Sequence, residues 1–149
     1  MQQMMIQLFL GTVLISCTVV IHAVGTVSAV PLLRRVARQI INERSQISRL
    51  LFVIIVVLWL FLLHTAEVWL WAACYLVLTD LPDFETALYF STVSFTTLGY
   101  GDVVLAEDWR LLSALQAANG ILLFGWSTAF LFAVVRRVWD AKLSETADT

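Results

Sequence analysis

Residues 84–102 read FETALYFSTVSFTTLGYGD, and this stretch determines how the rest of the chain is interpreted. Its first part, Phe84–Phe95, predicts a helix of 12 residues and about 18 Å. The residues before it, Thr79–Asp83, combine Asp and Pro in the manner typical of a helix start. Such a helix is too short to cross a hydrocarbon core of roughly 30 Å but reaches halfway into it. The second part, Thr96–Asp102, predicts a loop with glycine at two alternate positions.

Three long apolar windows surround this stretch. They are Ile6–Val30 with 25 residues, Leu50–Leu78 with 29 and Leu111–Val135 with 25. The whole chain of 149 residues is 60% hydrophobic and 13% charged, where soluble domains average about 45–50% and 25%. Each window can cross a bilayer, in which the backbone must satisfy its own hydrogen bonds by forming a helix. The sequence therefore predicts an all-α membrane protein with three transmembrane helices and a short re-entrant helix.

The first window could also be a cleaved signal peptide. Its leader, Met1–Met5, carries no Lys or Arg, and its apolar run exceeds the about 7–15 residues typical of that segment. We therefore favour a membrane helix that is retained.

Basic residues lie on one side of the predicted membrane. Eight of the nine are in the connection between the first two windows or after the third window: Arg34, Arg35, Arg38, Arg44, Arg49, Arg136, Arg137 and Lys142. The segment Thr79–Arg110 has six acids and one base. By the positive-inside rule, the C-terminus is cytoplasmic and the N-terminus lies outside with Thr79–Arg110. We expect a multi-pass protein of a prokaryotic inner or plasma membrane. Its expected partner is the lipid bilayer, and we expect no nucleic acid partner.

The arginines that begin at Arg34 could also be read as a voltage sensor. A sensor needs cations at helical spacing within the membrane, whereas these follow Pro31, where the apolar run has ended. We therefore favour a solvated cytoplasmic turn near anionic lipid.

The loop resembles the selectivity filter of the potassium-channel pore domain. Thr97-Leu98-Gly99-Tyr100-Gly101 matches the Thr-Val-Gly-Tyr-Gly signature of that family at four of five positions, and Asp102 follows as it commonly does there. The resemblance implies a homotetramer in which K⁺, as the permeating ion, binds at Thr97, Leu98, Gly99 and Tyr100. It implies no other cofactor.

The flanking segments follow in the order that the resemblance requires. The pore domain covers residues 50–138, with an outer helix at 50–78, a pore helix at 84–95, a filter at 96–102 and an inner helix at 111–135. Outside it lie an extra N-terminal transmembrane helix at 1–33, a cytoplasmic basic connection at 34–49 and a short cytoplasmic tail at 139–149.

The filter chemistry also follows from the residues themselves. A dehydrated cation needs closely spaced oxygens, which backbone carbonyls provide if successive residues alternate in conformation. Gly99 and Gly101 can adopt the positive φ values that this alternation requires, because they have no Cβ. The Thr97 hydroxyl can add a further ring of oxygens. The alternative interpretation is a glycine-rich external turn.

Four residues are candidates for supporting the filter: Tyr89, Phe90, Val93 and Asp102. By resemblance, Tyr89 hydrogen-bonds the Asp102 carboxylate behind the filter, with Phe90 beside it. Val93 occupies a position where some family members carry a buried acid, and Leu98 replaces the usual Val, which affects the expected selectivity. Interfacial anchoring or packing is the alternative role for Tyr89 and Phe90.

Small and ionisable residues also interrupt the apolar windows. Gly120 and Gly125 are candidate gating hinges, and close helix packing is the alternative that we favour. His64 and Glu67 share a helix face, and His22 could join them in a proton or metal site. We favour hydrogen bonds between the helices as their role.

These observations predict a potassium-selective channel that conducts passively. The alternatives are a weakly selective monovalent cation channel and a non-conducting membrane subunit whose first helix binds an unknown membrane partner. The sequence lacks nucleophile and base pairs, zinc-ligand spacing and phosphate-binding loops, so we do not expect an enzyme.

Overall fold

The computed structural model describes residues 1–42 and 46–147, with side chains described for 1–36 and 46–139. Its helices in chain order are α1 (Gln2–Asn42), α2 (Gln46–Leu78), α3 (Phe84–Phe95), the short 3₁₀ helix η1 (Glu107–Trp109) and α4 (Arg110–Ala147). Helices α1, α2 and α4 are long and apolar enough to cross a membrane. Within the described residues there is no strand, which confirms the all-α membrane fold.

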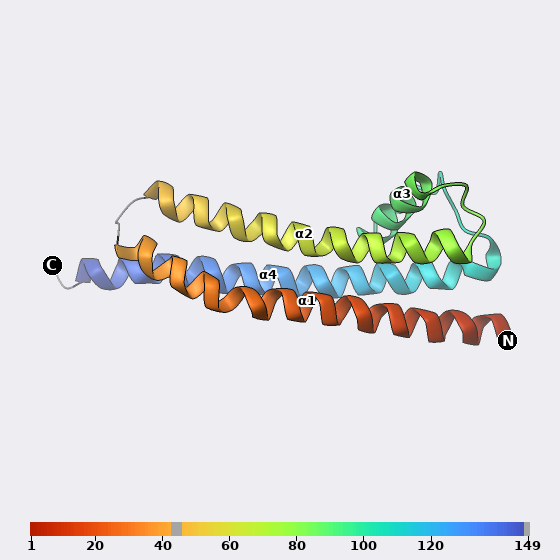
Figure 1. Cartoon of the computed structure of the whole chain (residues 1–149), viewed down its shortest axis with the longest axis horizontal. Helices are drawn as coiled ribbons and strands as arrows, with labels where there is room; N and C mark the ends of the chain where they lie inside the picture. Colours follow the sequence, from red (N-terminus) through yellow and green to blue (C-terminus); the bar gives the residue numbers. More distant parts are fainter. Residues whose placement is uncertain (43–45, 148–149) are drawn as a thin grey trace.

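The three long helices lie side by side, and α3 packs against α2 and α4 at one end of the bundle (Figure 1). The N-terminus lies at the end that carries α3, and the C-terminus lies at the opposite end (Figure 1). Helix α1 packs against both α2 and α4. The extra helix is therefore an integral part of the bundle.

The helices extend beyond the apolar windows. Helix α1 continues to Asn42 through Pro31, α2 begins at Gln46, and α4 continues to Ala147. An apolar window marks the part of a helix that can lie in hydrocarbon, whereas helical hydrogen bonding continues through polar residues of good helix propensity. Residues 34–42 and 139–147, assigned from the sequence to a connection and a tail, are therefore helical.

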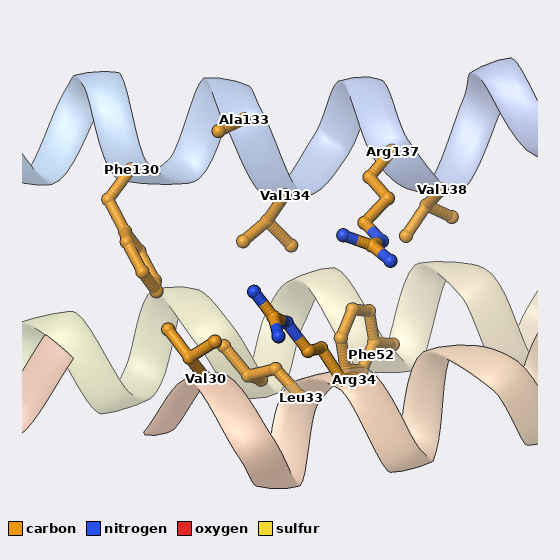
Figure 2. Close-up of a pocket in the computed structure, with 9 residues that line it drawn as sticks. All are labelled: Val30, Leu33, Arg34, Phe52, Phe130, Ala133, Val134, Arg137 and Val138. Carbon is orange, nitrogen blue, oxygen red and sulfur yellow. The ribbon is translucent and has the colours of Figure 1, made fainter. Parts of the chain in front are cut away.

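The end of the bundle opposite α3 contains an apolar cluster, in which Phe52 and Val138 are buried. A pocket of about 160 Å³ adjoins this cluster, and Arg34 of α1 and Arg137 of α4 reach into it between apolar side chains (Figure 2). Arg49 is buried, whereas Arg34 is exposed. The basic segment is thus partly packed rather than fully solvated. Arg44, like the side chains of Arg38 and Lys142, lies outside the described residues.

Candidate functional site

Helix α3 begins with a side-chain cap. The Asp83 carboxylate accepts a hydrogen bond of 2.7 Å from the Thr86 backbone N–H. This bond holds the pKa of Asp83 below its usual 3.8. A carboxylate at this position satisfies an unpaired N–H of the first turn and complements the positive end of the helix dipole. The sequence expectation of a helix start at this point is confirmed.

A buried hydrogen-bond network fixes α3 to α2 and α4. The Tyr75 hydroxyl donates to Gln116 Oε1 at 2.9 Å, and Gln116 Nε2 donates to Ser91 Oγ at 2.7 Å. The Ser91 hydroxyl donates in turn to the backbone carbonyl of Val68 at 2.8 Å. Tyr75, Ser91 and Gln116 are fully buried, so each polar group depends on these partners. Sequence reasoning missed this network, although Gln116 was visible as a polar residue within an apolar window.

The C-terminal end of α3 lies against α4 at Gly120. A Cβ at Gly120 would overlap the Phe95 backbone carbonyl oxygen. Gly120 is ten residues from the start of α4, a rise of about 15 Å, or half of a hydrocarbon core. Helix α3 thus ends near mid-membrane. Close packing explains Gly120, whereas nothing lies within 4 Å of a Cβ built at Gly125.

The loop after α3 has an alternating backbone. Thr97, Gly99 and Gly101 have φ of 61°, 56° and 79°, and Leu98 and Tyr100 between them do not have positive φ. A Cβ at Gly99 or Gly101 would meet nothing within 4 Å, so backbone conformation alone favours glycine there. Thr97 is β-branched, which makes its positive φ strained. The sequence anticipated this conformation at the two glycines and missed it at Thr97.

The backbone of α3 holds the start of the loop. The Val93 carbonyl accepts from Leu98 N at 3.0 Å and from Gly99 N at 3.4 Å, and the Thr97 N–H donates to the Ser94 carbonyl at 3.0 Å. Val93 therefore contacts the loop through its backbone oxygen, where sequence reasoning considered only its side chain. Leu98 and Tyr100 are 54% and 66% exposed in the single chain.

Tyr89 and Asp102 form the hydrogen bond expected from the resemblance. The Tyr89 hydroxyl donates to Asp102 Oδ2 at 2.6 Å, and Asp102 Oδ1 accepts from Val103 N at 3.0 Å. The shared hydrogen bond lowers the pKa of Asp102 below 3.8 and raises the pKa of Tyr89 above 10.0. Phe90 is buried and packs edge-on against Tyr75 at 5.1 Å between ring centroids. Phe90 thus packs in the core, and Tyr89 ties the end of the loop back to α3.

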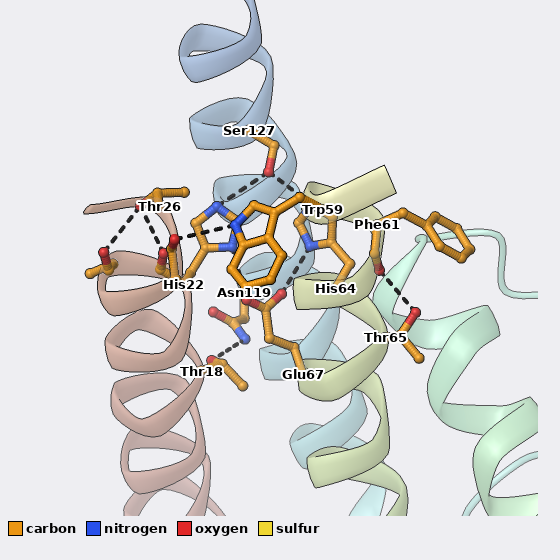
Figure 3. Close-up of polar contacts among 12 residues, drawn as sticks. Thr18, His22, Thr26, Trp59, Phe61, His64, Thr65, Glu67, Asn119 and Ser127 are labelled. Atoms are coloured by element: carbon orange, nitrogen blue, oxygen red, sulfur yellow. Dashed lines mark hydrogen bonds and ion pairs between the residues drawn. The ribbon is translucent and has the colours of Figure 1, made fainter. Parts of the chain in front are cut away.

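A second polar cluster lies between α1, α2 and α4, close to the end of α3 (Figure 3). Glu67 accepts from or donates to His22 Nδ1 at 2.8 Å and His64 Nδ1 at 2.9 Å, one imidazole at each carboxyl oxygen. Ser127 Oγ lies 2.9 Å from His64 Nε2 and 3.2 Å from His22 Nε2. The expectation of hydrogen bonds between the helices is confirmed. One ligand atom from each of the two imidazoles and Glu67 also lies within 4.8 Å of the others, a spacing compatible with a metal ion.

A span, a short helix ending near mid-membrane, a strained loop and a second span define a membrane pore module. A family model described as "Ion channel" matches residues 54–137, more than half of the chain. The chain therefore belongs to this ion channel family. Helix α1 lies wholly outside the matched residues, whereas most of α4, against which it packs, lies within them. No curated protein and no solved structure matches the chain.

Proposed function

We propose that the protein is a potassium-selective channel that conducts K⁺ passively as a homotetramer. In this proposal the backbone carbonyls of Thr97, Leu98, Gly99 and Tyr100, with the Thr97 hydroxyl, replace the water around the ion. The alternation of positive φ at Thr97, Gly99 and Gly101 is the observation that carries the proposal. Such alternation turns successive carbonyls toward one side of the strand, which a lone external turn does not need.

Two features of the single chain support assembly around an axis. The proposed filter begins where α3 ends, near mid-membrane. Non-helical backbone at that depth is tolerated only if it is buried or lines water. The side chains of Leu98 and Tyr100 are largely exposed, which leaves them free to pack against neighbouring copies. Four copies would bury these side chains and enclose a water-filled path. One chain supplies one quarter of such a filter.

The negative end of the α3 dipole supports the same function. Helix α3 ends at Phe95, near mid-membrane, and its last carbonyls carry a partial negative charge. Four such ends directed at a common cavity would favour a cation there. The distribution of basic residues supports a topology with the N-terminus and residues 79–110 outside and the C-terminus in the cytoplasm. We propose a prokaryotic inner or plasma membrane as the location.

A weakly selective cation channel is the second candidate, because Leu98 stands where the filter signature has Val. The extra bulk must fit behind the filter, and an imperfect fit would widen the ring of carbonyls. The two candidates share fold and assembly and differ in how strongly they discriminate K⁺ from Na⁺.

Ion flux through the purified full-length chain in liposomes tests these candidates. We expect a tetrameric species, K⁺ flux that a blocking cation stops, and a reversal potential close to that of K⁺ under unequal K⁺ and Na⁺. Equal permeability to both ions would establish the weakly selective channel. A chain that inserts but passes neither ion would identify a non-conducting subunit and refute the proposal.

A further inference from the structure

The cluster of His22, Glu67, His64 and Ser127 forms a closed ring of four contacts, and we call it the histidine–carboxylate ring (Figure 3). Helix α1 contributes His22, α2 contributes His64 and Glu67, and α4 contributes Ser127. His22 and Glu67 have no exposed surface. The imidazoles stack at 5.2 Å between centroids, with the carboxyl group at one edge and the hydroxyl at the other.

Taking all four contacts as hydrogen bonds gives a count of the hydrogens in this ring and, from it, the charge. Each of its four contacts needs one hydrogen between its two heavy atoms. Ser127 brings one, and an ionised Glu67 brings none, so the imidazoles must bring three and one of them must be an imidazolium. If Glu67 is instead protonated, two neutral imidazoles complete the set. Both arrangements are electrically neutral, and both hold one proton more than a carboxylate with two neutral imidazoles.

The surroundings favour this neutral, four-hydrogen state. The aromatic rings that pack against the imidazoles belong to Trp126, Phe95 and Phe124, none of which carries a charge. Thr18 and Asn119, which hydrogen-bond each other beside the ring, are also neutral. Loss of the proton would leave a net negative charge at a buried site within the membrane, where an uncompensated charge is costly.

We propose that the histidine–carboxylate ring is a proton-binding site that holds one shared proton at neutral pH and couples its occupancy to α4. An ionised Glu67 still accepts from both Nδ1–H groups after the proton leaves. The contact that lacks a hydrogen is therefore one of the two that Ser127 makes. In that contact the Ser127 oxygen faces the lone pair of one Nε2 atom. Release of the proton weakens the attachment of α4 and leaves the contact of α1 with α2 intact.

A path for the proton is present on the α2 and α4 side. A pocket of about 220 Å³ is lined by His64, Ser127 and Thr128 among apolar side chains of both helices. The His64 side chain is 13% exposed, whereas that of Glu67 is fully buried. His64 is thus the member of the ring through which a proton enters or leaves.

Nitrogen NMR of the full-length protein in lipid bilayers tests the proton count directly. The chain has two histidines, and both belong to the ring, so ¹⁵N-labelled histidine reports on this site alone. A free imidazole is mostly neutral at about pH 7. At this pH we expect the NMR spectrum to show one imidazolium, or the infrared spectrum to show a protonated carboxyl group whose band is lost in Glu67→Gln. Two neutral imidazoles beside an ionised carboxylate would overturn the proposal.

A divalent transition ion is the competing occupant, because the same three side chains have compatible spacing. Zn²⁺ is added to the labelled protein at about pH 7. We expect the ring nitrogens to keep their hydrogens. Stoichiometric binding that removes the Nδ1 hydrogens would assign the site to a metal and overturn the proton proposal.

Glu67→Gln separates the proton from the shape of the ring. A glutamine amide donates one hydrogen and accepts another, so it completes all four contacts with two neutral imidazoles and without the extra shared proton. We expect the unfolding midpoint of the wild type in detergent to fall as the ring loses its shared proton with rising pH, and Glu67→Gln not to show this fall. The matched control, Glu107→Gln on the exposed η1, keeps the wild-type response. Equal pH responses in wild type and Glu67→Gln would contradict the proposal.

The same variants link the ring to conduction, and this arm rests on the proposed function. We expect K⁺ flux in liposomes to change as the ring loses its shared proton in the wild type and in Glu107→Gln, and not to show this change in Glu67→Gln. A chain without K⁺ flux would refute the channel but not the proton site, because the NMR and unfolding measurements need no conduction. Flux whose pH response is unaffected by Glu67→Gln would refute the coupling to α4.

Discussion

Tyr89 and Asp102, which we call the filter pair, and the histidine–carboxylate ring each contain one carboxyl group. The two sites differ in the sequence separation and in the burial of their members. Tyr89 and Asp102 are 13 residues apart and share one exposed hydrogen bond. In the ring, His22 and Ser127 are 105 residues apart, and the contacts are buried or partly buried within three packed helices. The filter pair follows from the local sequence, whereas the ring exists only after α1, α2 and α4 have packed.

The two sites also differ in what a single chain can satisfy. The filter presents Leu98 and Tyr100 on its surface and supplies one quarter of the proposed conduction path. The ring closes all four of its contacts without a second copy. Changes at the filter should therefore alter conduction while each chain stays folded, and changes at the ring should first alter the stability of each chain.

Gly101→Ala should have the largest effect on conduction. Gly101 has φ of 79°, and a Cβ there costs about 1–2 kcal/mol in every subunit. Fourfold repetition of this cost should distort the carbonyl rings together, so we expect loss of K⁺ selectivity or of all flux. Reversal potentials and flux in liposomes measure this effect, and membrane insertion should be unchanged because no apolar span is altered.

D-alanine at position 101, introduced by chemical ligation, is the matched control for this substitution. It adds the same Cβ with the opposite hand, which positive φ accommodates, and a Cβ built there meets no atom within 4 Å. We expect it to restore selective flux. Wild-type selectivity in Gly101→Ala itself would show that this loop is not the filter.

His22→Ala should have the largest effect on stability. It removes one partner from Glu67 and one from Ser127 inside the bundle, and each buried polar group left without a partner costs about 1–3 kcal/mol. Chemical unfolding in detergent measures the loss. Val20→Ala is the control, because Val20 lies on the same helix and is 59% exposed. Equal losses in both variants would mean that the ring adds nothing beyond ordinary helix packing.

The contrast between the two sites also explains what the sequence could predict. The spans, the short helix and the positive φ at Gly99 and Gly101 depend on local composition and on glycine, so they are readable from the chain. The ends of the helices were harder to predict, because hydropathy marks the membrane crossing and not the end of helical hydrogen bonding. Helix α4, for example, continues to Ala147. Thr97 was missed because residue type alone gives no indication of a positive φ at a β-branched residue.

Long-range polar contacts were predictable only as residue types. His22, His64 and Glu67 were recognisable as unusual within apolar windows, but their mutual distances depend on the rotation of three helices about their axes. Ser127 gave no such indication, since serine is common where membrane helices pack. The network of Tyr75, Gln116 and Ser91 was missed because its distances also depend on how the packed helices are rotated about their axes.

Tyr89→Phe should have a smaller effect than Gly101→Ala. It removes the hydroxyl that donates to Asp102 and leaves the backbone of the loop free to keep its conformation. We expect flux to persist with a reduced preference for K⁺ over Na⁺, measured as a shift in reversal potential. Asp102→Asn keeps an oxygen that can accept from Tyr89, so its shift should be smaller still. A Tyr89→Phe channel with wild-type selectivity would remove the filter pair from the support of the filter.

The smallest expected effect is the response of the filter pair to pH. The pKa of Asp102 lies below 3.8, so its contribution to stability is complete above that value and is lost as the pH falls through the lowered pKa. The pKa of Tyr89 lies above 10.0, so its contribution is complete below that value and is lost as the pH rises through the raised pKa. Neither group titrates between about pH 5 and pH 9.

Above about pH 7, selectivity should therefore be constant once the carboxyl group of the ring is replaced. We expect the K⁺ to Na⁺ permeability ratio of Glu67→Gln, taken from reversal potentials, to be the same from about pH 7 to about pH 9. Adding Tyr89→Phe to that background decides whether a remaining change comes from the filter pair. A ratio that drifts with pH in Glu67→Gln and becomes constant when Tyr89→Phe is added would mean that the exposed pair titrates near neutrality. The division between a filter pair insensitive to pH and a ring that responds to it would then be wrong.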